Sequence, residues 1–238
     1  MKERGIIFNT EMVRAILDGR KTQTRRVMKP QPVPINDGAN HVWYCDKIKA
    51  DLDVKDALQD GIVGWYGLIS SVCPFGGVGD RLWVRETFAL LGNEDGVCVD
   101  WNDNILKAGE EQAARIYKAS CEQKDGDYGL WSIPDDADWK PHTDNHKYEG
   151  TWRPSIHMPR WASRITLEIT NVRVERLQSI SEEDAKAEGF DNSQSDAANS
   201  IGWFEKPIRA FRRAWENIYG TEGWDSNPWV WVIEFKRV

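Results

Sequence analysis

Hydrophobic and polar positions near the start of the chain alternate in a way that predicts a strand followed by a helix. Residues 5–8, GIIF, read as a short first strand. The next apolar residues have helical spacing and share one face: Val13, Ile16 and Leu17. Asn9 or Thr10 can cap this helix, and Gly19 can end it.

The segment that follows Gly19 is expected to be extended. It reads GRKTQTRRV over residues 19–27 and contains no acidic residue. Three prolines end it, because proline lacks the N–H that a strand ladder needs: Pro30, Pro32 and Pro34.

Two strands are predicted farther along the chain. Residues 79–90, GDRLWVRETFAL, read as a turn followed by a strand with alternating faces. Residues 162–177 form the longest strand-like run, with apolar positions alternating against polar neighbours.

The carboxy-terminal third predicts two helices and a closing strand. Ser181 and Asp184 resemble a capping box, and Gly189 supplies the stop of that helix. A second helix begins near Pro207 and ends at Gly220. Residues 228–238 are aromatic and β-branched, as expected for a central strand buried on at least one face.

The middle of the chain carries weaker patterns. Residues 35–78 read as mixed and loop-rich, and residues 92–150 are rich in Asp, Gly and Asn with one expected strand at RIYKAS. We interpret residues 92–150 as an irregular acidic insertion that decorates one domain spanning residues 1–238.

The order of elements predicts an α+β fold. Neither a repeated βαβ pattern nor a phosphate-loop or dinucleotide glycine motif is present. We therefore expect a small, mostly antiparallel and partly closed β-sheet with helices flanking its openings.

The distribution of charge is uneven. The net charge is −7, but residues 92–150 hold 14 acidic and 6 basic residues, which leaves 24 acidic and 25 basic residues elsewhere. Residues 19–36 and 150–167 lack acids entirely. Each of these windows is either a basic patch for an anionic partner or an ordinary solvated edge.

The cysteines, the histidines and the hydropathy of the chain bear on three further features: disulfides, metal sites and membrane spans. The four cysteines contain no CxxC pair, and we read them as free thiols of a cytoplasmic protein. His142 and His146 have the spacing of a helical metal pair, but their neighbours favour a loop, so no metal is expected. No apolar run is long enough for a membrane span, so no membrane partner is expected.

Four segments in order resemble the ASCH domain family of the PUA-like superfamily. They are ILDGRKTQTRR, GDRLWVRE, ITNVRVERLQSISEEDAKAEGF and WVIEFKRV. They cover about a quarter of the chain, and the chain looks most like larger members encoded by bacteriophages and prophages. Residues 36–78 and the acidic insertion match nothing in the family's pattern.

The resemblance implies a small PUA-like β-barrel with a cleft for a base or nucleotide. A small bacterial relative is an amidohydrolase that deacylates N4-acetylcytidine with a lysine, a threonine and a glutamate. The G-x-K-T-x-T-x-R motif carries the first two roles to Lys21 and Thr24, and a gap-free match through ISEEDAKAEG carries the third to Glu188. No cofactor is implied, and the host would be a bacterial cell.

The residues themselves give this chemistry a rationale. Threonine needs a nearby base, and lysine can serve only if its pKa falls from about 10.4 toward neutrality. Burial and the like charges of the basic stretch both lower that pKa. In a regular strand Lys21 and Thr24 face opposite sides, so their meeting requires a bend after Gly19.

Glu188 is placed where helix electrostatics disfavour an acid, in the last turn of its helix. Glu188 is either a functional residue or a surface glutamate whose unfavourable position costs little free energy. Glu86, after WVR, can pair with Arg25 or Arg26, or accept a hydrogen bond from the amino group of a cytosine, and the structural ion pair is the favoured role.

Other residues are candidates for contacting the substrate. They are Arg20, Arg25, Arg26, Trp152, His157, Arg160 and Trp161. Aromatic and basic side chains together can form a rim that stacks bases and contacts phosphates. The alternative is that the tryptophans are core residues and the arginines extend from it to solvent.

Three functions stay open at this stage. The first is an amidohydrolase acting on N4-acylated cytosine nucleosides, and the second is a non-catalytic module that binds RNA or a modified base. A ribonuclease is the weakest of the three. The expected partner is a nucleoside or a nucleic acid, RNA rather than DNA, and the sequence does not fix the oligomeric state.

Overall fold

The computed structural model describes ten stretches of the chain. They are residues 1–35, 40–58, 68–91, 97–102, 104–106, 110–123, 130–132, 147–149, 152–193 and 196–238. Their contacts divide the chain into two units. The first unit comprises Met1–Arg4, Ala15–Leu82 and Leu167–Val238, and the second comprises Gly5–Arg14 and Trp83–Thr166. The prediction of a single domain stays a prediction.

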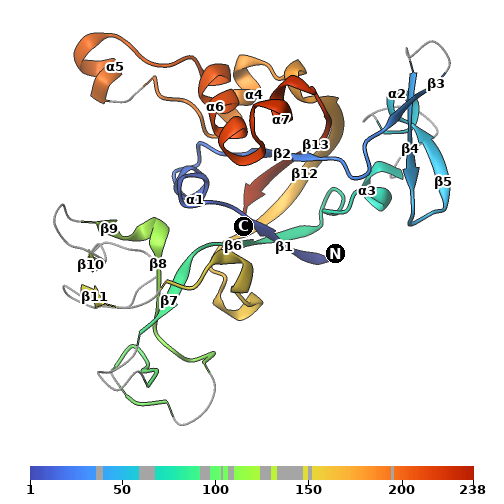
Figure 1. Ribbon diagram of the computed structural model, residues 1–238. Coiled ribbons are helices and arrows are strands. Elements are labelled where there is room, and N and C mark those ends of the chain that lie inside the picture. The colour runs from blue at the N-terminus through green and yellow to red at the C-terminus, as the bar shows by residue number, and fades with distance from the viewer. Residues whose placement is uncertain are drawn as a thin grey trace. The chain divides into compact units, whose positions relative to one another are not determined.

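A five-stranded sheet forms the framework (Figure 1). Its order is β1 (Glu3–Ile7), β6 (Arg81–Arg85), β12 (Thr166–Arg176), β13 (Trp229–Arg237) and β2 (Gln23–Val27). Backbone bonds from Arg81 to Lys2 and from Phe8 to Arg85 make β1 parallel to β6. β13 pairs antiparallel with both β12 and β2. The α+β class is confirmed, but the described strands form no closed barrel.

The first helix and its exit follow the prediction. α1 spans Thr10–Leu17, and the Asn9 carboxamide accepts a hydrogen bond from the Met12 amide at 2.8 Å, which caps the helix. Gly19 has a φ of +74°, a conformation that glycine adopts without strain, and ends it. β2 begins four residues later and ends at Val27.

Four helices of the first unit follow β12 and precede β13 in the sequence. They are α4 (Glu182–Ala187), α5 (Asp196–Ile201), α6 (Pro207–Tyr219) and α7 (Thr221–Asp225). The capping box of Ser181 with Asp184 is present, and α6 has Pro207 at its start and Gly220 at its end. These predicted boundaries are confirmed, whereas α5 and α7 were not predicted.

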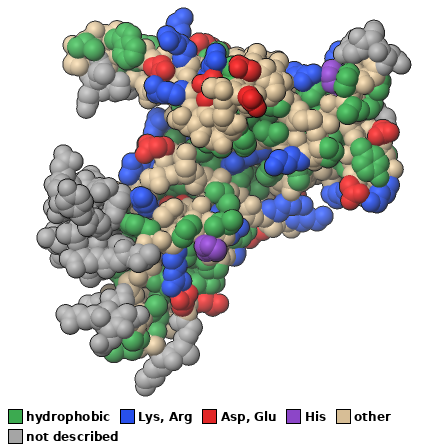
Figure 2. Space-filling view, in the orientation of Figure 1, with side chains coloured by type: hydrophobic (Ala, Val, Ile, Leu, Met, Phe, Trp, Pro, Cys, Tyr) green, Lys and Arg blue, Asp and Glu red, His purple; other side chains and the backbone are tan. Residues whose placement is uncertain are grey.

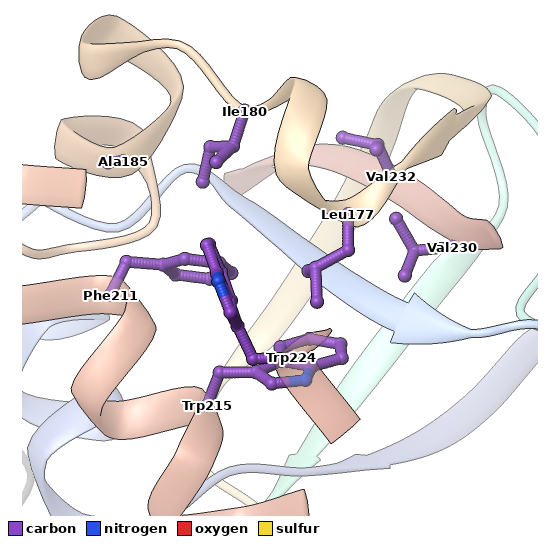
Figure 3. Close-up of a cluster of buried hydrophobic side chains, with 8 residues drawn as sticks. All are labelled: Leu177, Ile180, Ala185, Phe211, Trp215, Trp224, Val230 and Val232. Atoms are coloured by element: carbon purple, nitrogen blue, oxygen red, sulfur yellow. The ribbon is translucent and has the colours of Figure 1, made fainter. Parts of the chain in front are cut away.

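One hydrophobic cluster of the first unit joins β13 to the helices α4, α6 and α7 (Figure 3). Val230 and Val232 of β13 share this buried cluster with aromatic side chains from α6 and α7. The cluster consists of Leu177, Ile180, Ala185, Phe211, Trp215, Trp224, Val230 and Val232. Because α6 carries its apolar residues on one stripe, burying that stripe against the sheet places its arginines outside.

Residues 35–78 contain more regular structure than the sequence predicts. A three-stranded sheet has the order β3 (Val33–Ile35), β4 (Asn40–Cys45) and β5 (Ala50–Asp53), followed by the short helices α2 (Val54–Ala57) and α3 (Leu68–Val72). Pro34 lies inside β3, which pairs only with β4, so its missing N–H is tolerated at an edge. Trp43 of β4 packs edge-on against Trp231 at 5.5 Å.

The second unit contains short strands and single turns of 3-10 helix. The strands are β7 (Phe88–Leu90), β8 (Arg115–Tyr117), β9 (Glu122–Gln123), β10 (Leu130–Ser132) and β11 (Lys147–Glu149). β7 pairs with β8, which confirms the strand expected at RIYKAS. Ile116 and Cys121 are buried against Ala89, so part of the acidic insertion belongs to the packed interior of this unit.

None of the described helices is long and apolar enough to cross a membrane.

Candidate functional site

The junction of β2 and α4 brings together two segments that the sequence places far apart. The Lys21 amide donates to the Ala15 carbonyl at 2.9 Å, and the Thr22 amide donates to the Ala187 carbonyl at 2.8 Å. These bonds fix the chain after α1 against the end of α4, where Lys21 and Glu188 form an antiparallel bridge.

A glycine makes this approach possible. Gly189 has a φ of +98°, and a Cβ added there would lie 2.9 Å from the Ala15 Cβ and 3.3 Å from the Lys21 Cβ. Both the backbone conformation and the lack of space therefore require glycine after Glu188. Gly189 thus ends α4 at the point where Ala15 and Lys21 pack against it.

Lys21 and Glu188 form a buried ion pair. Lys21 Nζ donates to Glu188 Oε2 at 2.6 Å and to the Glu188 carbonyl at 2.9 Å. The exposed fractions of the two side chains are 0% and 2%. A charge-assisted hydrogen bond removed from water is short and strong, and losing either partner leaves an uncompensated charge.

Burial makes the ammonium form of Lys21 less favourable than it is in water. Burial lowers the pKa of Lys21 below its usual value, because desolvation penalises the ammonium ion. The charge and hydrogen bond of Glu188 oppose this effect, while the positive charges of Arg26 and Arg25 add to it. A lysine with a lowered pKa can accept a proton nearer to neutral pH, as a general base must.

Arg25 completes the surroundings of Glu188. Its NH1 lies 3.4 Å from Glu188 Oε1, and its NH2 lies 3.2 Å from Glu175 Oε2 and 3.1 Å from Asp184 Oδ2. Its side chain has no exposed surface. A residue predicted to contact substrate is thus occupied by three carboxylates inside the protein.

A second arginine extends this network. Arg173 of β12 forms ion pairs with Glu175, with Asp184 at 3.0 Å and with Glu234. The Gln23 carboxamide also donates to Asp184 Oδ1 at 3.0 Å. The ionic network therefore joins β2, β12 and β13 to both ends of α4, through Asp184 in its first turn and Glu188 at its C-cap.

Thr24 is buried but does not join the Lys21–Glu188 pair. The register of β2 on β13 is continuous from Gln23 to Val27, so Thr24 faces the side of the strand opposite to Gln23 and Arg25. Thr24 as a whole is 2% exposed. The Lys21 amine is instead directed at the carbonyl and the carboxylate of Glu188.

The two remaining arginines of the basic stretch differ in exposure. Arg20 is exposed and donates to the Gly189 carbonyl at 3.0 Å, and it also pairs with Asp18 at 2.9 Å. Arg26 is hydrogen-bonded to Tyr219, and burial lowers the pKa of its guanidinium, opposed by Tyr219 and Glu188. Lys21 and Arg25 of this stretch are therefore buried inside the protein. On the face of the molecule in Figure 2, basic and acidic side chains are interspersed over α6 and α7.

Glu86 lies in the second unit and has a different partner from the one predicted. Arg164 binds it through two parallel hydrogen bonds, from Nε to Oε1 at 2.9 Å and from NH2 to Oε2 at 3.0 Å. Burial raises the pKa of Glu86, and Arg164 opposes that shift. Glu86 therefore forms the structural ion pair that its sequence context favours, but its partner is Arg164 and not Arg25 or Arg26.

The four residues of the predicted rim also belong to the second unit. Trp152 and Trp161 are half-buried and pack against apolar clusters, and Arg115 lies 5.2 Å from the Trp161 ring. His157 and Arg160 are exposed. Their assembly with Lys21 into one substrate site stays a prediction.

The predicted histidine pair, His142 and His146, lies outside the described residues. Among the described residues, no group of three His, Cys, Asp or Glu side chains could hold a metal ion. All four cysteines are free.

Several residues of the ionic network were missed by sequence reasoning. Alternation identifies Glu175 and Arg173 only as polar positions of a strand, and the capping pattern identifies Asp184 only as part of a helix cap, whereas the structure places all three in ion pairs. One signal was available: a strand buried on both faces cannot leave charges on one face unless they pair. VRVERL and SEEDAKAEG hold five acids against the two bases of TRR, and the sequence alone does not show which acid meets which base.

Comparisons with models of known protein families, with curated proteins and with solved structures found no match for this chain.

Proposed function

We propose that this chain is an ASCH-type hydrolase with a PUA-like fold that removes the acyl group from N4-acylated cytosine nucleosides. One observation carries the proposal. Lys21 and Glu188, which the ASCH resemblance marks as functional from two separate motifs, lie 2.6 Å apart in a buried pair. Buried ionisable pairs with a lysine of lowered pKa occur preferentially at functional sites.

The proposed reaction is an acyl transfer followed by hydrolysis. The uncharged amine of Lys21 takes the proton of a hydroxyl nucleophile, whose oxygen forms a bond to the acyl carbon. The bond between the acyl carbon and N4 then breaks, and the departing amino group of the cytosine receives the proton from Lys21. Water releases the acid, and Glu188 orients the lysine throughout.

Thr24 is the nucleophile that the resemblance implies. Because its side chain faces the opposite side of β2, direct proton transfer to Lys21 requires the strand to rearrange when substrate binds. The substrate must also open a path to the amine, since neither Lys21 nor Glu188 has more than 2% exposed side-chain surface. A water molecule activated by Lys21 is the alternative nucleophile.

The test is the release of cytidine from N4-acetylcytidine, followed by chromatography. The wild-type chain should turn over, and Lys21→Arg should lose activity because its guanidinium stays protonated. Thr24→Ser should retain activity and Thr24→Val should lose it if Thr24 is the nucleophile. Undiminished activity in Thr24→Val assigns attack to water, and no turnover by wild type removes the proposal for this substrate.

A second candidate is a non-catalytic module that binds RNA or a modified base. It is favoured by the same burial, because a lysine and an arginine fully enclosed by carboxylates also form a structural network. It predicts oligonucleotide binding that weakens with salt and with Arg20→Ala, since Arg20 is the exposed arginine of the stretch. Binding that is indifferent to both would remove this candidate.

A further inference from the structure

Arg25 occupies the side of Glu188 that Lys21 leaves open. Lys21 Nζ contacts Oε2 of the carboxylate at 2.6 Å, and Arg25 NH1 contacts Oε1 at 3.4 Å. Neither cationic side chain has any exposed surface. The two oxygens of one carboxylate are therefore held by two cations that come from the same stretch of chain.

Arg25 is itself anchored from two other directions. Its NH2 lies 3.2 Å from Glu175 Oε2 on β12 and 3.1 Å from Asp184 Oδ2 on α4. The planar guanidinium group presents several donors in a fixed arrangement, so three carboxylates together restrict both its position and its plane. A lysine at this place would supply the charge without the arrangement.

The position of Arg25 also offsets the repulsion between two carboxylates of α4. Asp184 and Glu188 are four residues apart, and like charges at this spacing on a helix repel each other. Arg25 contacts both carboxylates, and Arg173 contacts the other oxygen of Asp184. The two acids can therefore be enclosed together because Arg25 lies between them.

We propose that Arg25 is a positioning residue of the Lys21–Glu188 pair. It holds the carboxylate so that Oε2 is directed at the amine, and it shares the negative charge that would otherwise act on Lys21 alone. The motif that carries the ASCH resemblance leaves position 25 open, so this assignment comes from the contacts of this chain. Its kinetic consequence rests on the proposed function, but its effect on Lys21 does not.

The charges that surround the Lys21 amine determine the expected effect. They are Glu188 from α4, and Arg26 and Arg25 from β2. Removing the charge of Arg25 removes one repulsion and leaves Glu188 to Lys21, and both changes favour the protonated amine. A base that is harder to deprotonate works only at higher pH.

A direct test follows the titration of Lys21 by NMR. The full chain is labelled with 13C at the lysine Cε, and the Lys21 signal is assigned by its loss in Lys21→Arg. Arg25→Gln should move the titration midpoint upward by about one pH unit. Arg25→Lys should produce a smaller upward shift, because its charge remains but its bridging geometry is lost.

The control is Arg213→Gln, which removes an exposed arginine paired with Glu205 at 2.7 Å. It should leave the Lys21 midpoint unchanged. A midpoint that is unchanged or lowered in Arg25→Gln overturns the proposal. If Arg25→Gln does not fold, Arg25→Lys decides alone, and the absence of an upward shift in that variant overturns it.

The kinetic arm uses N4-acetylcytidine. The pH at which kcat/KM rises should move in Arg25→Lys by the same amount as the NMR midpoint. A shifted midpoint with an unshifted rate profile contradicts a role of Arg25 in the reaction. A wild-type chain without turnover overturns the proposed function, and the titration then still decides whether Arg25 positions the pair.

Discussion

Lys21 Nζ and Glu188 Oε2 lie 2.6 Å apart, although 167 residues separate them in the sequence. The contact is enclosed by the end of α1, the start of β2 and the C-cap of α4. Because both side chains are shielded from water, the pair affects stability, proton affinity and the proposed reaction at once.

Breaking this pair should destabilise the chain strongly. Lys21→Met leaves the Glu188 carboxylate buried with Arg25 as its remaining cation, and we expect a loss of about 3–5 kcal/mol in the free energy of unfolding. Urea denaturation monitored by tryptophan fluorescence would measure it. The double variant Lys21→Met/Glu188→Leu should recover much of the loss, because no unpaired charge remains. A double variant as unstable as the sum of both single variants would contradict this account.

The Lys21 amine should also leave a signature in the pH dependence of stability. Its pKa is lowered in the folded protein from an unfolded value of 10.5, so the unfolded chain binds more protons between these two values. Its contribution is therefore fully present above pH 10.5 and is lost as pH falls through the folded pKa. The stability difference between wild type and Lys21→Met should grow as pH rises through this window. A difference that is constant with pH would show that the pKa of Lys21 is not lowered.

In the second unit, Glu86→Gln should destabilise more than a comparable change on the surface. It leaves the Arg164 guanidinium, whose side chain is 10% exposed, without its carboxylate, and we expect a loss of about 3–5 kcal/mol. Glu110→Gln breaks an exposed pair with Arg153 and should cost less than about 1 kcal/mol. Chemical denaturation of both variants measures the contrast. Equal losses would mean that burial does not set the strength of the Glu86 pair.

Trp215 and Trp203 offer a matched comparison in the first unit. Trp215 is 4% exposed and also donates to the Gly223 carbonyl, so Trp215→Ala should cost about 3–5 kcal/mol. Trp203 is 64% exposed, and Trp203→Ala should change stability by less than about 0.5 kcal/mol. Thermal unfolding of the two variants would reveal the difference. A large loss in Trp203→Ala would contradict its exposed position.

The parts of the fold that sequence reasoning predicted have local causes. Gly19 ends α1, the Ser181 capping box begins α4 and Pro207 begins α6. Each of these signals acts through residues close in sequence, so these helix boundaries can be predicted from the sequence. The short strands β3 to β5 could not be read in this way, because Trp43 is stabilised in β4 by a distant partner, Trp231.

In the candidate site, too, some residues can be predicted from the sequence and others cannot. Lys21 and Glu188 could be named from sequence through a motif, and the structure brings them together. The partners of Arg25 and Glu86 could not, since an ion pair depends on which strands become neighbours. Alternation predicted that Thr24 and Lys21 face opposite sides of a regular strand, and the register of β2 keeps Thr24 away from the pair.

The central claim is that the buried amine of Lys21 is the base of an acyl transfer. The most direct measurement compares two pH titrations of the wild-type chain: kcat/KM for N4-acetylcytidine and the NMR signal of the Lys21 Cε. We predict that the rate rises with the same midpoint as the deprotonation of Lys21. Turnover whose midpoint differs from that of Lys21, or that persists unchanged in Lys21→Arg, would contradict the claim.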